Sequence, residues 1–92
     1  MKYQIRRTSQ FKKDYKRSIK RGLAIDKLDK AIELLATDGH LPPEYNDHLL
    51  VGNKKGLREC HIAPDWLLVY RIEHGILMLV LTSTGSHSDI FN

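Results

Sequence analysis

The chain has 92 residues, one of them a cysteine, and a formal net charge of +4. This length suits a single domain, 1–92, and leaves no room for a second hydrophobic core. A hydrophobic fraction of 41% with 28% charged residues is near the average for globular proteins, which argues against disorder. Because there is no long apolar run, no signal-peptide pattern and no possible internal disulfide, we expect a soluble cytoplasmic protein that does not bind membranes.

Charge is divided unevenly along the chain. Residues 1–30 contain 11 Lys/Arg and three Asp, whereas residues 31–92 contain four Lys/Arg and eight acidic residues. All five histidines lie in the second part. The first part is therefore suited to contact a polyanion, and the second part to exchange protons near neutral pH.

The first part predicts one strand and two helices. Residues 2–6 favour a short strand, and Thr8 or Ser9 can cap a helix that ends near Gly22. Apolar residues recur at every fourth position of this helix and form one stripe, while basic residues form two rows on the other side. A second helix is predicted over 26–37.

The two basic rows carry six positive charges, and only Asp14 and Asp26 are near enough to offset them. Most charge runs are simply solvated helix faces. Here the excess on one side favours contact with a polyanion, with binding that weakens steeply as salt rises. The six residues are Lys12, Lys13, Lys16, Arg17, Lys20 and Arg21.

The second part predicts a connector and three strands. Residues 40–48 cannot continue a helix because they contain two adjacent prolines. An Ala-Pro corner separates the first two strands, and a His-Gly hairpin, whose glycine supplies a positive φ, joins the last two. The last strand is apolar on both faces, as expected inside a sheet, and the tail after it is polar. The strands are expected at 57–62, 66–73 and 76–83.

The order β-α-α-β-β-β predicts an α+β domain in which two N-terminal helices pack on one face of a mainly antiparallel sheet. The opposite face of the sheet remains available for a ligand.

Three segments carry a resemblance to a known family: DHLL at 47–50, GLRECHIAPDWLLVY at 56–70 and TGSHSDIF at 84–91. Together they resemble the YafQ branch of the RelE/ParE superfamily, the toxins of bacterial type II toxin–antitoxin systems, and the resemblance extends over the whole chain. This chain departs from the YafQ pattern at one position. The pattern has Arg two residues before the glycine of the C-terminal motif, and this chain has Ser83 there.

The resemblance implies a RelE-like fold and a ribosome-dependent mRNA endoribonuclease, or mRNA interferase, that inhibits translation without a metal or cofactor. It further implies a cognate antitoxin of the DinJ/RelB kind, an antitoxin complex that binds operator DNA through the antitoxin, and mRNA in the ribosomal A site as substrate. The basic rows would then contact 16S ribosomal RNA. Carried over by position, the site consists of His48, His61, Asp65, Trp66, His87 and Phe91.

The chemistry of such a site is consistent with these residue types. Attack by a 2′-hydroxyl on the neighbouring phosphate requires a base and an acid, each of which contributes about 10²–10⁴-fold in rate. Histidine serves either role, since its ordinary pKa is about 6.5. His87 is the first candidate for proton transfer, and His61 and His48 are candidates for its complement and for phosphate contact. Asp65 would orient a histidine or act as the base.

The remaining site positions have two interpretations each. Trp66 and Phe91 offer flat rings on which a base can stack, worth about 1–3 kcal/mol. A tryptophan taken alone is most often a core residue, however, and Phe91 is equally suited to pinning the tail by packing. Ser83 cannot supply a positive charge to the phosphate. Arg58, Arg71 or a lysine would have to replace the missing Arg.

No metal site is expected from local spacing. The chain has no CxxC or HxxxH motif, and the adjacent Cys60 and His61 point to opposite faces of one strand.

Two other functions remain open. A ParE-like toxin of the same superfamily would inhibit DNA gyrase by binding and would not need several histidines on one face. A degenerate toxin would retain antitoxin binding and operon autoregulation without catalysis. In every case the basic first part is a docking surface for an acidic or partly disordered antitoxin.

Overall fold

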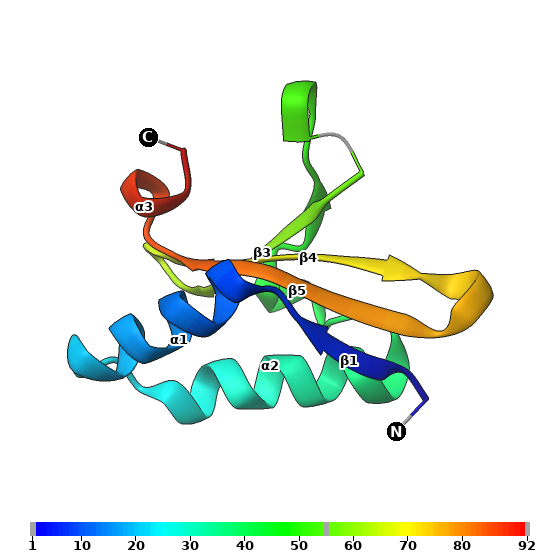
Figure 1. Cartoon of the computed structure of the whole chain (residues 1–92), viewed down its shortest axis with the longest axis horizontal. Helices are drawn as coiled ribbons and strands as arrows, with labels where there is room; N and C mark the ends of the chain where they lie inside the picture. The colour runs from blue at the N-terminus through cyan, green and yellow to red at the C-terminus, as the bar shows by residue number, and fades with distance from the viewer. Residues whose placement is uncertain (1, 55, 92) are drawn as a thin grey trace.

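The computed structural model describes residues 2–54 and 56–91, so residues 1, 55 and 92 of the predicted domain lie outside the described part. Helices and one mixed sheet form the α+β fold predicted from the sequence (Figure 1). The elements are β1 (Gln4–Arg7), α1 (Ser9–Lys20), α2 (Ile25–Asp38), β2 (His48–Leu49), β3 (Arg58–Ala63), β4 (Trp66–Glu73), β5 (Met78–Gly85) and α3 (His87–Phe91). Short 3-10 turns occur at η1 (Pro43–Tyr45), η2 (Gly52–Lys54) and η3 (His74–Ile76).

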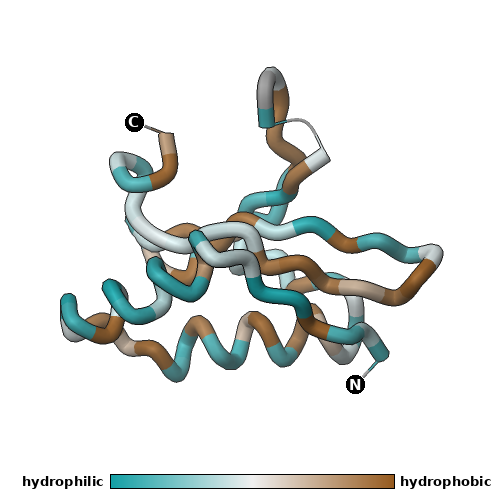
Figure 2. Tube along the Cα trace, viewed as in Figure 1, coloured by the Kyte–Doolittle hydropathy of each residue, from teal (hydrophilic) through white to brown (hydrophobic). Residues whose placement is uncertain are grey.

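The sheet has the strand order β1-β5-β4-β3-β2. The β1–β5 pair is parallel and the other pairs are antiparallel. The apolar last strand therefore lies inside the sheet, as predicted, with Leu79, Val80 and Leu81 all buried. Figure 2 shows this run of apolar residues along β5 and their periodic recurrence along α2.

Helices α1 and α2 cover one face of the sheet, and the hydrophobic core lies between them (Figure 1). Phe11 from α1 and Leu28 and Leu35 from α2 pack with Leu68 and Tyr70 of β4. The N-cap predicted at the start of α1 is Thr8, whose Oγ1 accepts a hydrogen bond from the backbone N–H of Phe11 at 3.0 Å. The core thus fixes which face of the sheet is left open.

Three features differ from the sequence prediction. A fifth strand, β2 (His48–Leu49), forms at the end of the predicted connector, because it pairs with β3. The hairpin between β4 and β5 is a 3-10 turn in which Leu77, and not the glycine, takes the left-handed conformation, with φ of 51°. The polar tail forms the short helix α3, because Ser86 and Asp89 cap each other's backbone. The Asp89 carboxylate accepts from the Ser86 N–H at 2.9 Å, and the Ser86 hydroxyl accepts from the Asp89 N–H at 3.1 Å. This S-x-x-D pattern was a readable signal for the helix.

Across residues 2–54 and 56–91, no helix combines the length and apolar character needed to cross a bilayer.

Candidate active site on the open face of the sheet

The candidate site lies on the face of the sheet that α1 and α2 leave uncovered. Strand register pairs His48 with Glu59, Glu59 with Val69, and Val69 with Ser83. Directly paired residues point to the same face of a sheet, so this row crosses four strands on one side. In Figure 1, α3 and the η2 turn rise from the sheet on this side, opposite the two long helices.

Three histidines from three separate segments meet on this face. His48 comes from β2, His61 from β3 and His87 from the first position of α3. The ring centroids of His48 and His61 are 6.4 Å apart, and those of His61 and His87 are 5.9 Å apart. The structure therefore brings together imidazoles that are 39 positions apart along the chain, with His61 in the middle.

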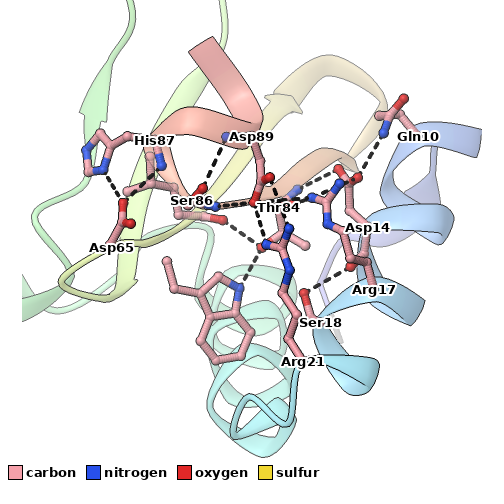
Figure 3. A network of polar contacts seen from close by, with 12 residues as sticks. Gln10, Asp14, Arg17, Ser18, Arg21, Asp65, Thr84, Ser86, His87 and Asp89 are labelled. Carbon is pink, nitrogen blue, oxygen red and sulfur yellow. Dashed lines mark hydrogen bonds and ion pairs between the residues drawn. The ribbon is translucent and has the colours of Figure 1, made fainter. Parts of the chain in front are cut away.

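Asp65 holds His87 by two hydrogen bonds. Its Oδ1 accepts from the backbone N–H of His87 at 3.0 Å and lies 2.7 Å from Nδ1 of the same residue (Figure 3). These bonds, the backbone one first, lower the pKa of Asp65 from its ordinary value. An ionised Asp65 fixes the ring orientation and leaves Nε2 of His87 for proton transfer.

Glu59 belongs to this cluster and was missed in the sequence. Its Oε1 lies 3.5 Å from Nε2 of His48 and 3.6 Å from Nε2 of His61. The residue is only 4% exposed, and within the described part of the chain its buried Oε2 has no hydrogen-bond partner. The signal was the i, i+2 spacing of Glu59 and His61, which places both side chains on one strand face.

An aromatic ring and a cation complete the row. Phe91 is 46% exposed, and its ring centroid lies 6.4 Å from that of His87. The Nζ of Lys54, from the η2 turn, lies 5.7 Å from the Phe91 ring centroid. Phe91 is therefore placed where an unstacked base can rest beside His87.

Two predicted substrate-binding residues are not available to a ligand on this face. Trp66 is 4% exposed, and its Nε1 donates to the Thr84 hydroxyl at 3.0 Å inside the core, so its ring cannot stack on a base. Arg58 pairs in register with buried Tyr70, on the face opposite to Glu59. Its Nε donates to Asp47 at 2.8 Å, and the Tyr70 hydroxyl donates to the same carboxylate. The core interpretation of Trp66 holds, and Arg58 is a structural cation.

The basic helix also needs correction. Arg17 lies 3.2 Å from Asp14 and donates to the Thr84 carbonyl at 3.1 Å, and Arg21 lies 2.7 Å from Asp89 (Figure 3). Arg21 and the Ser86 N–H hold the pKa of Asp89 well below its ordinary range. Both arginines thus fasten α1 to α3 and are not free cations. Arg21 is itself exposed, but it is held by Asp89. The exposed lysines of the basic rows are Lys12, Lys13, Lys16 and Lys20.

The close approach of α1 to α3 also explains why residue 85 is a glycine. A Cβ at Gly85 would lie 2.8 Å from Nη2 of Arg17 and 2.8 Å from Cβ of Asp89. Any larger residue would therefore push α3, and with it His87, away from the sheet.

Metal-ligating atoms gather here despite the absence of a local motif. Donor atoms of Glu59, His61 and His87 all lie within 4.8 Å of one another. Spacing along the chain could not reveal this cluster, because its donor atoms come from different segments, and the prediction that the chain has no metal site stays a prediction.

The chain matches the family model described as bacterial toxin of type II toxin-antitoxin system, YafQ, over residues 3–92. The chain belongs to the YafQ toxin family. The mRNA interferase toxin YafQ of Escherichia coli strain K12 is 36% identical over 88 residues, covering 95% of this chain and 94% of that protein.

Solved structures agree with this membership. The E. coli DinJ–YafQ toxin–antitoxin complex contains a chain with a TM-score of 0.90 and 34% identity, with complete coverage of both chains. A metal-bound toxin from Helicobacter pylori has a TM-score of 0.88 and 43% identity, covering 97% of this chain and 99% of that one. As a YafQ-family member, this chain is a toxin of a type II toxin–antitoxin system with a cognate antitoxin.

Proposed function

We propose that this YafQ-family toxin is an mRNA interferase that cuts mRNA in the ribosomal A site and so stops translation. The observation that supports this most strongly is the row of His48, His61 and His87 on one accessible face, with the carboxylates of Glu59 and Asp65 beside it. Imidazoles take up and release protons near neutral pH. A binding module has no need of such an array.

In the proposed reaction the 2′-oxygen bonds to the adjacent phosphorus while the bond from phosphorus to the 5′-oxygen breaks. A base removes the 2′-hydroxyl proton and an acid protonates the departing 5′-oxygen, which leaves a 2′,3′-cyclic phosphate and a 5′-hydroxyl. His87 suits the acid, because ionised Asp65 stabilises its charged ring. His61, between the other two rings, suits the base. His48, whose Nδ1 donates to the Asn46 carbonyl at 2.8 Å, suits phosphate contact.

Cleavage is tested by mapping RNA 5′ ends after brief induction of the wild type and of His87→Ala. We expect new 5′-hydroxyl ends within reading frames for the wild type only, with a rate loss of about 10²–10⁴-fold for the variant. Equal toxicity of the two proteins, or harmlessness of both, would contradict the catalytic assignment.

The acid and base roles are separated by a substrate in which sulfur replaces the bridging 5′-oxygen. A thiolate leaves without protonation, so this substrate should restore cleavage by His87→Ala but not by His61→Ala. If this substrate restored cleavage by His61→Ala and not by His87→Ala, His61 would be the acid and His87 the base.

The four exposed lysines of α1 are proposed to contact ribosomal RNA. Replacing Lys12, Lys13, Lys16 and Lys20 together by Gln should reduce the salt dependence of ribosome binding, by about 0.7 in log–log slope for each phosphate that is no longer neutralised. Arg17 and Arg21 should contribute little to that slope, since Asp14 and Asp89 already neutralise them.

An acidic segment of the cognate antitoxin is proposed to occupy the groove between β1, α1 and α2. This groove has a volume of about 570 Å³ and an apolar floor that includes Ile5 and Ile32. Three basic residues, Arg7, Lys12 and Lys16, outnumber the acidic Asp29 and Glu33 in its lining. Charge complementarity favours an acidic, partly apolar partner. Because Lys12 and Lys16 serve both surfaces, the antitoxin would exclude the ribosome, and operator DNA would be bound by the antitoxin in the complex. Lys12→Glu with Lys16→Glu should weaken the complex without reducing folding.

Transition-metal binding at the histidine cluster is a second proposal. It is favoured by buried Glu59, whose Oε2 has no hydrogen-bond partner among residues 2–54 and 56–91. One carboxylate and two imidazoles suit Zn²⁺ or Cu²⁺, and Glu59, His61 and His87 would hold the ion. A bound ion would act as a Lewis acid toward phosphate oxygens. A ring nitrogen whose lone pair binds the metal cannot also take up a proton, so added Zn²⁺ should slow cleavage by engaging His61 and His87. Because the ion would bind the folded protein, it should also raise the unfolding temperature. An unchanged unfolding temperature would rule this out.

The family match and the histidine row both favour the nuclease over the gyrase inhibitor. Induced cells should arrest translation with cut messages. A DNA-damage response with intact messages would instead support gyrase inhibition. If induction produced neither translation arrest nor DNA damage, the protein would be a degenerate toxin.

A further inference from the structure

The proposed reaction builds negative charge on the phosphate, and this charge requires a nearby cation. Ser83 points to the same face as Glu59, because both pair in register with Val69. Its hydroxyl is too short and uncharged to neutralise a phosphate. Another residue must therefore bring positive charge to this face.

The arginines around the site are already engaged. Arg58 is held by Asp47 on the core side of β3, and Arg71 lies 3.1 Å from Glu73. Arg17 is engaged by Asp14 of α1 and by Asp89 of α3, and Arg21 is engaged by Asp89. None of these four can turn to the histidines without breaking an ion pair.

Lys54 is placed differently. The η2 turn projects its ammonium over the exposed ring of Phe91, 5.7 Å from the centroid, and that ring adjoins His87. Lys54 and Ser83 also line one hollow of about 440 Å³. Asp14 and Asp89 line the same hollow, but Arg17 and Arg21 engage their carboxylates, so the Lys54 ammonium stays available.

We propose that Lys54 is a further catalytic residue, whose ammonium contacts a non-bridging oxygen of the scissile phosphate and offsets the charge that develops there. This inference rests on the proposed ribonuclease function. A base that stacks on Phe91 displaces the ammonium from the ring. The interaction between a solvated ammonium and an aromatic ring is weak, so Lys54 moves onto the phosphate at little cost.

The test is the single-turnover cleavage rate on ribosomes programmed with one message, at saturating toxin. Lys54→Met should lower this rate about 10²-fold, as expected for loss of one group that stabilises transition-state charge. Lys54→Arg should retain most of the activity. The optimum of the pH–rate profile should stay in place, because Lys54 transfers no proton.

Two further variants make the test specific. Ser83→Arg, introduced into Lys54→Met, should restore the rate, since it supplies a cation from the neighbouring position on the same face. Lys2→Met is the matched control, because Lys2 also lies over an aromatic ring, 5.5 Å from the centroid of Tyr3, at the other end of the molecule. This control should cleave like the wild type.

The outcomes separate the two proposals. Wild-type toxin that cleaves no message overturns the ribonuclease function itself. An active wild type with an equally active Lys54→Met overturns only the role of Lys54. A Lys54→Met variant with reduced ribosome affinity but an unchanged saturating rate also overturns it, since Lys54 would then act in binding alone.

Discussion

Two buried carboxylates on opposite faces of the sheet have very different surroundings. Asp14, 3% exposed, faces the helix side and accepts hydrogen bonds from Gln10 and the Thr84 N–H at 2.8 and 3.1 Å, besides its ion pair with Arg17. Glu59, 4% exposed, faces the histidines at 3.5–3.6 Å, and in the described part of the chain one of its oxygens lacks a partner.

This difference distinguishes a buried carboxylate that stabilises the fold, Asp14, from one that is a candidate for function, Glu59. A buried carboxylate costs free energy unless its hydrogen bonds are satisfied, so the network around Asp14 offsets this cost by joining α1 to β5. Among the described residues, Glu59 is left incompletely satisfied. A buried polar group of this kind is a candidate for a functional role, and for Glu59 we propose that this role lies with the neighbouring histidines.

The largest effect is expected for Asp14→Asn. This change leaves the buried Thr84 N–H and the one-third exposed Arg17 with a poorer partner. Since solvent reaches the arginine, the cost should lie near the lower end of the range for a buried ion pair, about 3 kcal/mol of unfolding free energy. Urea unfolding measures it. A loss below about 1 kcal/mol, the range of an exposed pair, would show that the network does not stabilise the fold.

Glu59→Gln should give the opposite pattern. Its interactions with the histidines are long, so the unfolding free energy should change by less than about 1 kcal/mol. The cleavage rate should fall about 10²-fold, because the negative charge beside His48 and His61 is removed. Unfolding and single-turnover cleavage are measured on the same preparation. Lower stability with an unchanged rate would place Glu59 among the structural carboxylates.

The two aromatic residues predicted to bind RNA extend the same contrast. Phe91→Ala should leave stability nearly unchanged, because the ring is 46% exposed, and should weaken substrate binding by about 1–3 kcal/mol. Trp66→Phe should do the reverse: removal of the hydrogen bond to Thr84 costs about 1 kcal/mol of stability, and cleavage stays unchanged. If Trp66→Phe abolished cleavage in a stable protein, its assignment to the core would be wrong.

Features that depend on neighbouring residues in the chain were predicted from the sequence. Strand β4 occupies 66–73 as predicted, because β-branched and aromatic residues follow one another between two turns, and α1 begins after Thr8 because that hydroxyl caps it. Family resemblance supplied His48, His61 and His87, and the fold brings them together.

What escaped prediction depends on pairing between distant segments. The partner of Arg21 is Asp89, 68 positions away, so a count of neighbouring charges could not show that this cation is neutralised. Glu59 was not among the predicted site residues, because its nearness to His48 depends on the pairing of β2 with β3. Trp66 was ambiguous because its environment depends on Thr84, from another strand.

The last prediction concerns Asp89, which joins the two regions. Its pKa is lowered in the folded protein, first because Arg21 donates a hydrogen bond to it. Stabilisation from such a group is present above the ordinary Asp pKa of about 3.9 and is lost as the pH falls through that value toward the lower folded pKa. Asp89→Asn should therefore cost about 1–2 kcal/mol of unfolding free energy at pH 7, and the difference from wild type should shrink below about pH 4.

Asp38→Asn is the matched control for this titration, because Asp38 is exposed at the end of α2, and its replacement should leave the unfolding free energy nearly constant over the same pH range. The double variant Arg21→Gln/Asp89→Asn should show a coupling energy of about 1 kcal/mol, as directly interacting residues do. Additive effects would mean that Asp89 stabilises α3 mainly through Ser86. Since α3 carries His87, a real coupling would also mean that a cation on the helix face positions the proposed acid on the open face.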